Sequence, residues 1–223
     1  MDGLLEADMF DGKGFVLGVL AKGHRLQGVS ALVVGACGVG PAIAASLAKA
    51  GVARLAALDA NPASSQALAD RLAAYPALRV KTGSKDPAGF GRIVNATPVD
   101  MNAGDPLPVD VARIDPGAFV VEVVLKSGMT SFLSAAERGC RYQAGTDMPF
   151  EQIPAYLDFC GFGRPAADEL RRAAMIGYQG PPLAPQCRRE SPHNGRTRAA
   201  IRNRAGSTKA AAPRRCHLPA RTA

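Results

Sequence analysis

A glycine-rich stretch early in the chain has the residue types that bind a phosphate group. In residues 31–51, ALVVGACGVGPAIAASLAKAG, four apolar residues lead to Gly35, Gly38 and Gly40, and an alanine-rich amphipathic segment follows. This order predicts a strand, a tight turn and a helix, and the N–H groups at such a helix start bind the pyrophosphate of a dinucleotide. The pattern G-x-G-x-x-G has its middle glycine at position 37, where this chain has Cys37. We therefore interpret the stretch as a dinucleotide site in which one glycine is replaced.

Cys37 bears on how tightly this turn binds. The middle glycine lets the backbone approach the pyrophosphate closely, so a Cβ and a sulfur atom at this position should weaken the contact. Two alternatives stay open: binding is lost altogether, or Cys37 is a reactive thiol, because a helix N-terminus favours the thiolate form. The predicted cofactor-binding turn consists of Gly35, Ala36, Cys37, Gly38, Val39 and Gly40.

A carboxylate follows at the place where the ribose of a dinucleotide would lie. Asp59 ends the second predicted strand, 19 positions after Gly40, and a carboxylate there accepts hydrogen bonds from the adenosine ribose. An arginine is expected beside the 2′-phosphate of NADP, and the first arginine after Asp59 is Arg71. The sequence therefore favours NAD over NADP as the cofactor. The alternative is a solvated aspartate at the end of a strand.

Further motifs, in order along the chain, resemble those of the shikimate dehydrogenase family. They are Val33-Val34-Gly35-Ala36 with Gly38, Asn95-Ala96-Thr97-Pro98, Thr130 with Ala135-Ala136 and Gly139, and Gly145-x-x-Met148-x-x-x-Gln152. Their order and spacing agree with the family from Asp8 to about Gly163. The resemblance implies an NAD(P)-dependent oxidoreductase that reversibly oxidises a hydroxyl of shikimate or quinate to the 3-dehydro ketone.

The resemblance also implies a catalytic and a substrate-binding residue. Asp11, in the segment DMFDGKGF at residues 8–15, falls on the family's catalytic aspartate. Gln152 falls on a glutamine that contacts the substrate. From the residues alone, Asp11 could equally cap the helix that follows it, and Gln152 could be an exposed helix residue.

Four more residues are implied to contact the cofactor. Asn95 and Thr97 would border the nicotinamide ribose, and Gly145 and Met148 would present their backbone to the nicotinamide. The alternative for Asn95 and Thr97 is a turn that merely ends a strand. Departures from the family pattern, besides Cys37, are Met9 and Phe10 in place of Asn and Thr, Asp100 in place of a glycine and Pro149 in place of a leucine.

The family places a substrate domain, with a lysine that pairs with the catalytic aspartate, ahead of this segment, whereas Met1 stands only ten positions before Asp11. We therefore expect this chain to be the carboxyl-terminal half of such an enzyme and to be inactive alone. Its expected partners are a hydroxy-acid substrate and either a separate amino-terminal substrate domain or a second copy of the chain. A non-catalytic NAD-binding remnant or interaction module is the alternative.

These residues need a framework that brings strand ends together. Apolar runs predict strands at 31–34, 54–58, 78–81, 92–95 and 119–124, and amphipathic segments predict helices at 38–50, 63–74, 130–138, 149–160 and 166–176. Asn61 before Pro62 predicts a helix cap, and Gly51 and Gly139 are predicted to follow helix ends with positive φ. Apolar strands that alternate with helices predict an α/β fold, a doubly wound, Rossmann-like parallel sheet.

Charge is distributed unevenly along the chain. The net charge of +8 divides into −1 for residues 1–180 and +9 for residues 181–223. The basic tail has no apolar periodicity and is predicted to be disordered; a nucleic-acid-binding arm and an out-of-frame translation product are the alternatives. The expected organisation is a segment and helix from a missing substrate domain at 1–27, a dinucleotide-binding domain at 28–163, a closing helix at 164–180 and the tail at 181–223.

Cysteine spacing and hydropathy exclude several other classes of protein. The five cysteines are irregularly spaced and form no C-x-x-C pair, so they match neither a disulfide framework nor a zinc site, and we expect no metal. No apolar run approaches the ~18 residues of a membrane span, and the acidic start lacks the order of a signal peptide. We therefore expect a cytoplasmic protein with reduced thiols that binds no membrane and no nucleic acid.

Overall fold

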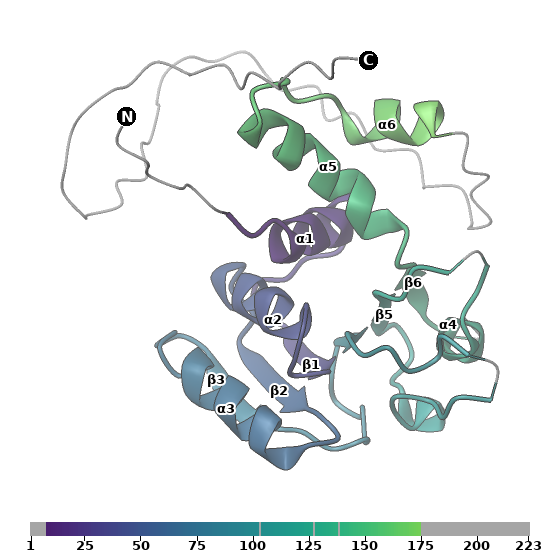
Figure 1. The fold of residues 1–223 in the computed structure, drawn as a ribbon. Helices are drawn as coiled ribbons and strands as arrows, with labels where there is room; N and C mark the ends of the chain where they lie inside the picture. The colour runs from purple at the N-terminus through teal and green to yellow at the C-terminus, as the bar shows by residue number, and fades with distance from the viewer. Residues whose placement is uncertain (1–7, 103, 127, 138, 175–223) are drawn as a thin grey trace, which may run out of the picture. The chain divides into compact units, whose positions relative to one another are not determined.

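The computed structural model describes residues 8–174 except 103, 127 and 138. Within this part of the chain, parallel strands form one sheet in the order β3-β2-β1-β4-β5-β6 (Figure 1). The strands are β1 (Ser30–Val34), β2 (Arg54–Leu58), β3 (Arg79–Thr82), β4 (Arg92–Asn95), β5 (Phe119–Glu122) and β6 (Arg141–Gln143). The order reverses between β1 and β4, because the chain returns to the middle of the sheet after it completes β3. The predicted Rossmann-like α/β fold is confirmed.

The helices of the described residues differ in how they begin, and only some have a side-chain cap. They are α1 (Asp11–Ala21), α2 (Gly40–Lys49), α3 (Pro62–Leu72), α4 (Ser131–Ala136), α5 (Asp147–Phe159) and α6 (Ala167–Ala173), with a short 3-10 helix η1 (Val111–Arg113). The Asn61 side chain accepts a hydrogen bond from the N–H of Ala63 at 3.0 Å, and Pro62 occupies the first turn of α3. Gly51, just after α2, has a φ of 87°. The predicted cap at Asn61 and positive φ at Gly51 are therefore confirmed.

Alternate residues of the central strands face two apolar cores. In β1, Ala31 and Val33 belong to the core that α1, α2 and α3 cover, whereas Leu32 and Val34 belong to the core that α4 covers. All four side chains are buried. The strands are apolar at successive positions because this parallel sheet is covered on both faces.

Glycines let α1 pack closely between α2 and α5 (Figure 1). A Cβ on Gly12 would lie 2.2 Å from the carbonyl oxygen of Ala42 in α2. A Cβ on Gly14 would lie 2.8 Å from the Cβ of Gln152 in α5. Both distances are shorter than van der Waals contact, so larger residues would push the helices apart. The glycines of the first helix therefore decide where α5, and with it Gln152, lies.

Two features differ from the expectation. The sequence does not predict β6, because Arg-Tyr-Gln contains no apolar run; this strand exists through its pairing with β5. The prediction of a positive φ at Gly139 is wrong. The reason is that α4 ends at Ala136, so Gly139 lies beyond the cap position rather than in it.

Two further expectations concern membranes and the tail. No helix in the described part of the chain is long and apolar enough to cross a membrane. The predicted disorder of residues 181–223 lies outside the described residues.

Candidate cofactor and substrate site

The carboxyl ends of β1, β2, β4 and β5 meet at one edge of the sheet. Val34 pairs with Leu58 and with Asn95, and Asn95 pairs with Glu122, so the segments that follow these residues are neighbours. In open α/β sheets a ligand binds outside this edge, where the strand order reverses. The reversal lies between β1 and β4. The candidate site therefore lies between the glycine turn and the turn after Asn95.

The turn after β1 requires the glycines that it contains. Gly35 and Gly38 have φ values of 106° and 55°, which residues with a Cβ rarely adopt. A Cβ on Gly35 would lie 2.6 Å from the carbonyl oxygen of Ala96, and one on Gly40 would lie 1.9 Å from the carbonyl oxygen of Gly35. The backbone thus makes a tight cradle at the start of α2. Because a helix start leaves N–H groups without intrahelical partners, this cradle fits an anionic group such as a pyrophosphate.

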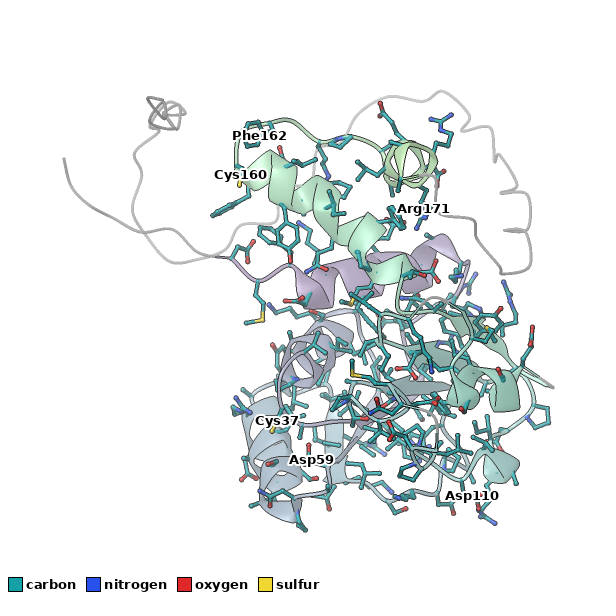
Figure 2. All side chains as sticks on the ribbon, turned by 45° about the vertical axis from the view of Figure 1, so that its right-hand side comes forward. Cys37, Asp59, Asp110, Cys160, Phe162 and Arg171 are labelled. Atoms are coloured by element: carbon teal, nitrogen blue, oxygen red, sulfur yellow. The ribbon has the colours of Figure 1, made fainter. Side chains whose placement is uncertain are left out.

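Asp59 follows β2 and holds the glycine turn; Figure 2 shows it near Cys37. Its Oδ2 accepts a hydrogen bond from the N–H of Ala36 at 2.8 Å, and its Oδ1 accepts one from the N–H of Asn61 at 2.9 Å. Asp59 is half-buried and bonded to the backbone, so it is not merely a solvated strand-end residue. An ionised carboxylate has about four lone-pair sites, so these two bonds leave room for the hydroxyls of a ribose.

Cys37 is exposed and its side chain approaches α3. Its Sγ lies 3.8 Å from the Oγ of Ser64, and its φ is outside the left-handed region. The backbone at this position therefore accommodates a side chain without strain. The Cβ and the sulfur stand beside the cradle, where a middle glycine would leave open space.

We expect the substitution Cys37→Gly to tighten NAD binding several-fold, because it restores the close approach of backbone to pyrophosphate. The matched control is Cys37→Ser, which removes the thiol but keeps the Cβ and should leave the affinity near that of the unmodified chain. Titrations of the three proteins with NAD, followed by fluorescence, compare the dissociation constants. Equal tightening by glycine and serine would show that the sulfur, rather than the Cβ, sets the affinity. Weaker binding by Cys37→Gly would contradict the assignment of this turn.

Asn95, the last residue of β4, is buried and shapes the turn that follows it. Its Oδ1 accepts hydrogen bonds from the N–H of Thr97 at 3.1 Å and from the Thr97 hydroxyl at 2.6 Å. Its Nδ2 donates to the carbonyl oxygen of Val99 at 3.1 Å and to the two carboxylate oxygens of Glu122 at 3.1 and 3.0 Å. The amide of Asn95 is thus engaged within the protein. Its place at this edge agrees with the expected position, but its bonds are those of a residue that orders the turn.

Glu122, which the sequence reasoning missed, ends β5 with 1% of its surface exposed. Its Oε1 accepts hydrogen bonds from the N–H groups of Val123 at 2.9 Å and Val124 at 3.0 Å, and its Oε2 accepts one from the Thr130 hydroxyl at 3.5 Å. Burial raises the pKa of Glu122 to about 7; the charge of Asp100 adds to the rise, and the accepted hydrogen bonds oppose it. The available signal was a carboxylate inside an otherwise apolar strand.

Asp100, which departs from the family pattern, has a backbone conformation that favours glycine. Its φ is 79°, which costs about 1–3 kcal/mol for a residue with a side chain. Its Oδ2 accepts a hydrogen bond from the N–H of Phe132 in α4 at 2.6 Å. Its Oδ1 is buried and has no hydrogen-bond partner among the described residues. Asp100 is therefore a strained, buried and incompletely bonded carboxylate beside Glu122.

Asp11 and Gln152 meet although 141 positions separate them. The Nε2 of Gln152 donates a hydrogen bond to the Oδ1 of Asp11 at 2.8 Å and a second to the hydroxyl oxygen of Tyr156. The cap position of α1 is Phe10, without a side-chain cap bond, and Gln152 is buried. Asp11 is thus no helix cap and Gln152 no exposed helix residue. The predicted catalytic and substrate-binding residues form one cluster.

Tyr156 joins this cluster and was not predicted. It lies one helical turn after Gln152, and its ring packs edge-on against Phe10 with ring centroids 4.9 Å apart. Burial and the charge of Asp11 raise the pKa of Tyr156. The phenol therefore stays protonated at neutral pH and has a hydroxyl proton to donate. Its spacing of four residues from Gln152 on a predicted helix was the available signal.

Gly145 and Met148 lie at the start of α5. A Cβ on Gly145 would lie 2.1 Å from the carbonyl oxygen of Val124, so the backbone here packs directly on the segment that follows β5. Met148 is half-buried and packs against the core that α1 helps to cover. A buried ion pair between Lys22 and Asp147, with a nitrogen-to-oxygen distance of 3.0 Å, holds this helix start. The contacts of Gly145 and Met148 with a nicotinamide remain predictions.

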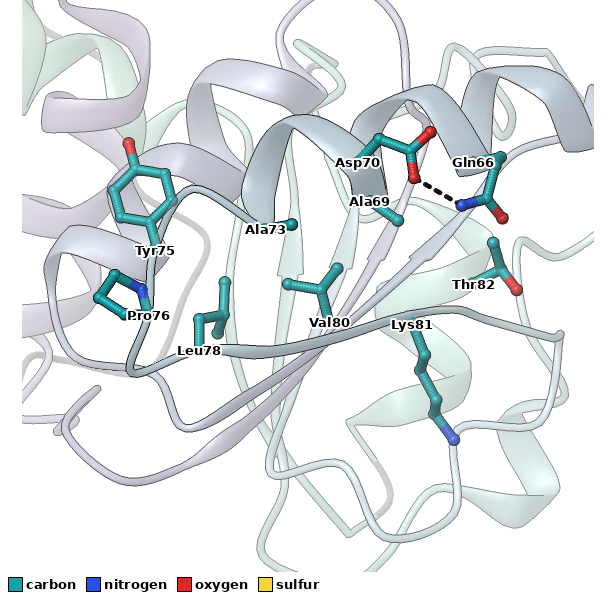
Figure 3. Close-up of a pocket in the computed structure, with 10 residues that line it drawn as sticks. All are labelled: Gln66, Ala69, Asp70, Ala73, Tyr75, Pro76, Leu78, Val80, Lys81 and Thr82. Atoms are coloured by element: carbon teal, nitrogen blue, oxygen red, sulfur yellow. Dashed lines mark hydrogen bonds between the residues drawn. The ribbon is translucent and has the colours of Figure 1, made fainter.

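A pocket of about 350 Å³ lies elsewhere, between α3 and the edge strand β3 (Figure 3). Gln66 and Asp70 line it from α3 and are hydrogen-bonded to each other at 2.8 Å, and Lys81 and Thr82 line it from β3. None of the predicted site residues is among the described residues that line it. Separately, the described part of the chain contains no group of three or more His, Cys, Asp or Glu side chains that could hold a metal ion.

Comparison with known proteins identifies relatives over most of the chain. No family model matches. A shikimate dehydrogenase (NADP(+)) from Rubrobacter xylanophilus is 36% identical over 142 residues, which are 61% of this chain and 50% of that protein. A shikimate dehydrogenase (NADP(+)) from Acidovorax ebreus is 32% identical over 186 residues, which are 78% of this chain and 66% of that protein. A quinate/shikimate dehydrogenase (NAD(+)) from Corynebacterium efficiens is 32% identical over 178 residues, which are 76% of this chain and 62% of that protein.

Solved structures agree with these relatives. A quinate dehydrogenase from Corynebacterium glutamicum in complex with NAD has a TM-score of 0.65 and 31% identity, covering 75% of this chain and 62% of that one. A shikimate 5-dehydrogenase from Thermus thermophilus in complex with NADP(H) and shikimate has a TM-score of 0.64 and 28% identity, and the match covers 74% of this chain and 61% of that one. The chain spans between half and two thirds of the length of the relatives that it matches. By its parallel sheet, its glycine turn and this shared sequence, the chain belongs to the shikimate/quinate dehydrogenase family.

Proposed function

We propose that this chain carries the NAD(P)-binding part and the catalytic aspartate of an oxidoreductase that reversibly oxidises a hydroxyl of shikimate or quinate to the 3-dehydro ketone. The observation that carries the proposal is the cluster of Asp11, Gln152 and Tyr156, in which a carboxylate, an amide and a phenol meet. Such a group can bind and deprotonate a hydroxyl. Support also comes from the family membership and from the glycine cradle at the start of α2.

The chain's own residues divide the work of this reaction. The carboxylate of Asp11 accepts the proton of the substrate hydroxyl during oxidation and returns it during reduction. Gln152 holds that carboxylate in place through its Nε2, and Tyr156 supplies a second hydroxyl beside it. A nicotinamide cofactor, when bound, would supply the acceptor for the hydride of the carbinol carbon. The residues that would hold the cofactor are the turn at 35–40, Asp59 and the turn at 95–99.

The experiment that tests this function separates binding from turnover. NAD binding is titrated by fluorescence, and oxidation of shikimate and of quinate is followed by the absorbance of NADH. Because the relatives are longer than their match to this chain, turnover is measured for the chain alone and for the chain mixed with the separately expressed amino-terminal part of the Acidovorax ebreus relative. We expect NAD binding by the chain alone and turnover in the mixture. Binding without turnover in either case would favour a non-catalytic NAD-binding module, and absence of binding would contradict both functions.

We further expect the chain to bind NAD more tightly than NADP by about 1 kcal/mol or more, roughly fivefold. Asp59 can accept hydrogen bonds from ribose hydroxyls, whereas its charge repels a 2′-phosphate. Competitive titration with the two cofactors measures the difference. The variant Asp59→Asn should reduce the preference, because it removes the charge while an amide oxygen remains for the N–H of Ala36. Equal or reversed affinities in the unmodified chain would contradict the assignment of Asp59.

A further inference from the structure

Glu122 is the hub of a buried network behind the candidate cofactor site. Its carboxylate accepts hydrogen bonds from the Asn95 amide, from the backbone N–H groups of Val123 and Val124, and from the hydroxyl of Thr130. Each of these groups donates, so the network suits a carboxylate that only accepts. A protonated carboxyl brings a donor of its own into a space already filled with donors. The hydrogen bonds of the network therefore favour the ionised form of Glu122 over the protonated form.

Asn95 connects Glu122 to the candidate cofactor site through hydrogen bonds. Because the Nδ2 of Asn95 faces the carboxylate, its Oδ1 faces Thr97 and accepts two hydrogen bonds from that residue. The Thr97 hydroxyl oxygen in turn accepts the N–H of Val99 at 3.1 Å. The conformation of the turn at 95–99 thus depends on an acceptor at position 122. This turn packs on the glycine cradle, since a Cβ on Gly35 would lie 2.6 Å from the carbonyl oxygen of Ala96.

The charge of Asp100 adds to the effect of burial on Glu122. The titratable and charged side chains on the segments around it are Arg92, Asp100, Asp105, Lys126, Glu137, Arg141, Tyr142 and Asp147. Of these, Asp100 acts on Glu122, and both carboxylates contact the start of α4, through Phe132 and Thr130 respectively. The Lys126 Nζ lies 3.4 Å from the backbone oxygen of Asp100.

We propose that Glu122 is a positioning residue whose ionised carboxylate holds the turn at 95–99 in the form that binds NAD, and that uptake of one proton by Glu122 releases this turn and weakens NAD binding. The proposal rests on the proposed function in one respect, namely that NAD is the ligand of this edge. Burial raises the pH at which the change occurs, and the negative charge of Asp100 raises it further, because it opposes ionisation of Glu122.

The pH dependence of binding follows from the pKa of Glu122 of about 7. If the ionised form alone binds, the apparent dissociation constant is inversely proportional to the fraction of protein in which Glu122 is ionised. At pH 6 about nine tenths of Glu122 is protonated, and at pH 8 about one tenth is. NAD binding is therefore about tenfold weaker at pH 6 than at pH 8.

Three variants test this proposal through the pH profile of NAD binding. Glu122→Gln cannot ionise, so its affinity should be at least tenfold below that of the unmodified chain at pH 8 and should not change between pH 6 and pH 8. Asp100→Asn keeps the shape but removes the charge, so the midpoint should move to lower pH. Glu137→Gln is the matched control, because it removes an exposed carboxylate just after α4 and should leave the profile unchanged. The proposal is overturned if Glu122→Gln keeps the original profile or if Asp100→Asn leaves the midpoint where it was.

A second measurement needs no ligand. The side-chain amide signals of Asn95, recorded by ¹⁵N NMR in the absence of NAD, should titrate with pH in the unmodified chain and not in Glu122→Gln. A dispersed amide spectrum shows that each variant is folded. If the chain binds no NAD at any pH, the proposed function fails, while the NMR titration still decides the role of Glu122. Asn95 signals that do not move between pH 5 and pH 9 would overturn the proposal.

Discussion

Replacing Asp11 by asparagine should lower the turnover of shikimate or quinate by ~10² to 10⁴, the usual contribution of a positioned general base. The asparagine keeps an oxygen that can accept the hydrogen bond from Gln152, which is 2.8 Å long in this structure, so the cluster should remain assembled. It cannot take up the proton of the substrate hydroxyl at neutral pH. The measurement is the rate of NADH formation in whichever assay form of the chain shows turnover.

Two controls make the result specific to Asp11. NAD affinity should stay unchanged in Asp11→Asn, because Asp11 belongs to α1 and not to the glycine turn. Asp158→Asn makes the same chemical change at an exposed position of α5 and should leave the rate unaltered. Turnover by Asp11→Asn within a few-fold of the unmodified chain would remove Asp11 from the proposed mechanism and direct attention to Tyr156.

Replacing Glu122 by glutamine should change how the free energy of unfolding depends on pH. A carboxylate whose pKa is raised on folding binds more protons in the folded state, so its contribution to stability is full below the unfolded pKa and is lost as pH rises through the folded pKa. For Glu122 the window runs from 4.5 to about 7, which corresponds to about 3 kcal/mol. The difference in unfolding free energy between Glu122→Gln and the unmodified chain should therefore shift by about 3 kcal/mol in favour of the variant between pH 4.5 and pH 7.5. Denaturant titrations at several pH values measure it.

The comparison uses the difference in unfolding free energy between Glu122→Gln and the unmodified chain, because folding lowers the pKa of His24 and so changes stability with pH in the opposite direction to Glu122. Burial, helped by the charges of Arg141, Arg92 and Lys22, lowers the pKa of His24 from 6.5 to about 4. Its contribution to stability is present above pH 6.5 and is lost as pH falls toward 4, so it offsets that of Glu122 in the unmodified chain. His24→Asn should uncover the fall in stability that Glu122 causes as pH rises. A difference between Glu122→Gln and the unmodified chain that is constant with pH would show that Glu122 ionises with an ordinary pKa.

The sequence by itself determined the local elements of this protein. The apolar strands, the cap at Asn61 and the positive φ at Gly51 all follow from short-range requirements. A strand in a sheet covered on both faces is apolar throughout, a cap side chain bonds to an N–H two residues away, and a tight turn needs a residue without a Cβ. Together with the order of the motifs, these features predicted the doubly wound fold and the edge where ligands bind.

Only the tertiary structure decided which polar groups of the candidate site meet. The contact of Asp11 with Gln152 depends on how closely α1 and α5 pack, and the existence of β6 depends on its pairing with β5. The raised pKa of Glu122 depends on burial by residues from several segments of the chain. Desolvation and hydrogen bonding are set by neighbours in space, and residues far apart in the sequence supply those neighbours. For that reason the chemistry of Glu122, Asp100 and Tyr156 emerges from the folded chain and not from the local pattern of its residues.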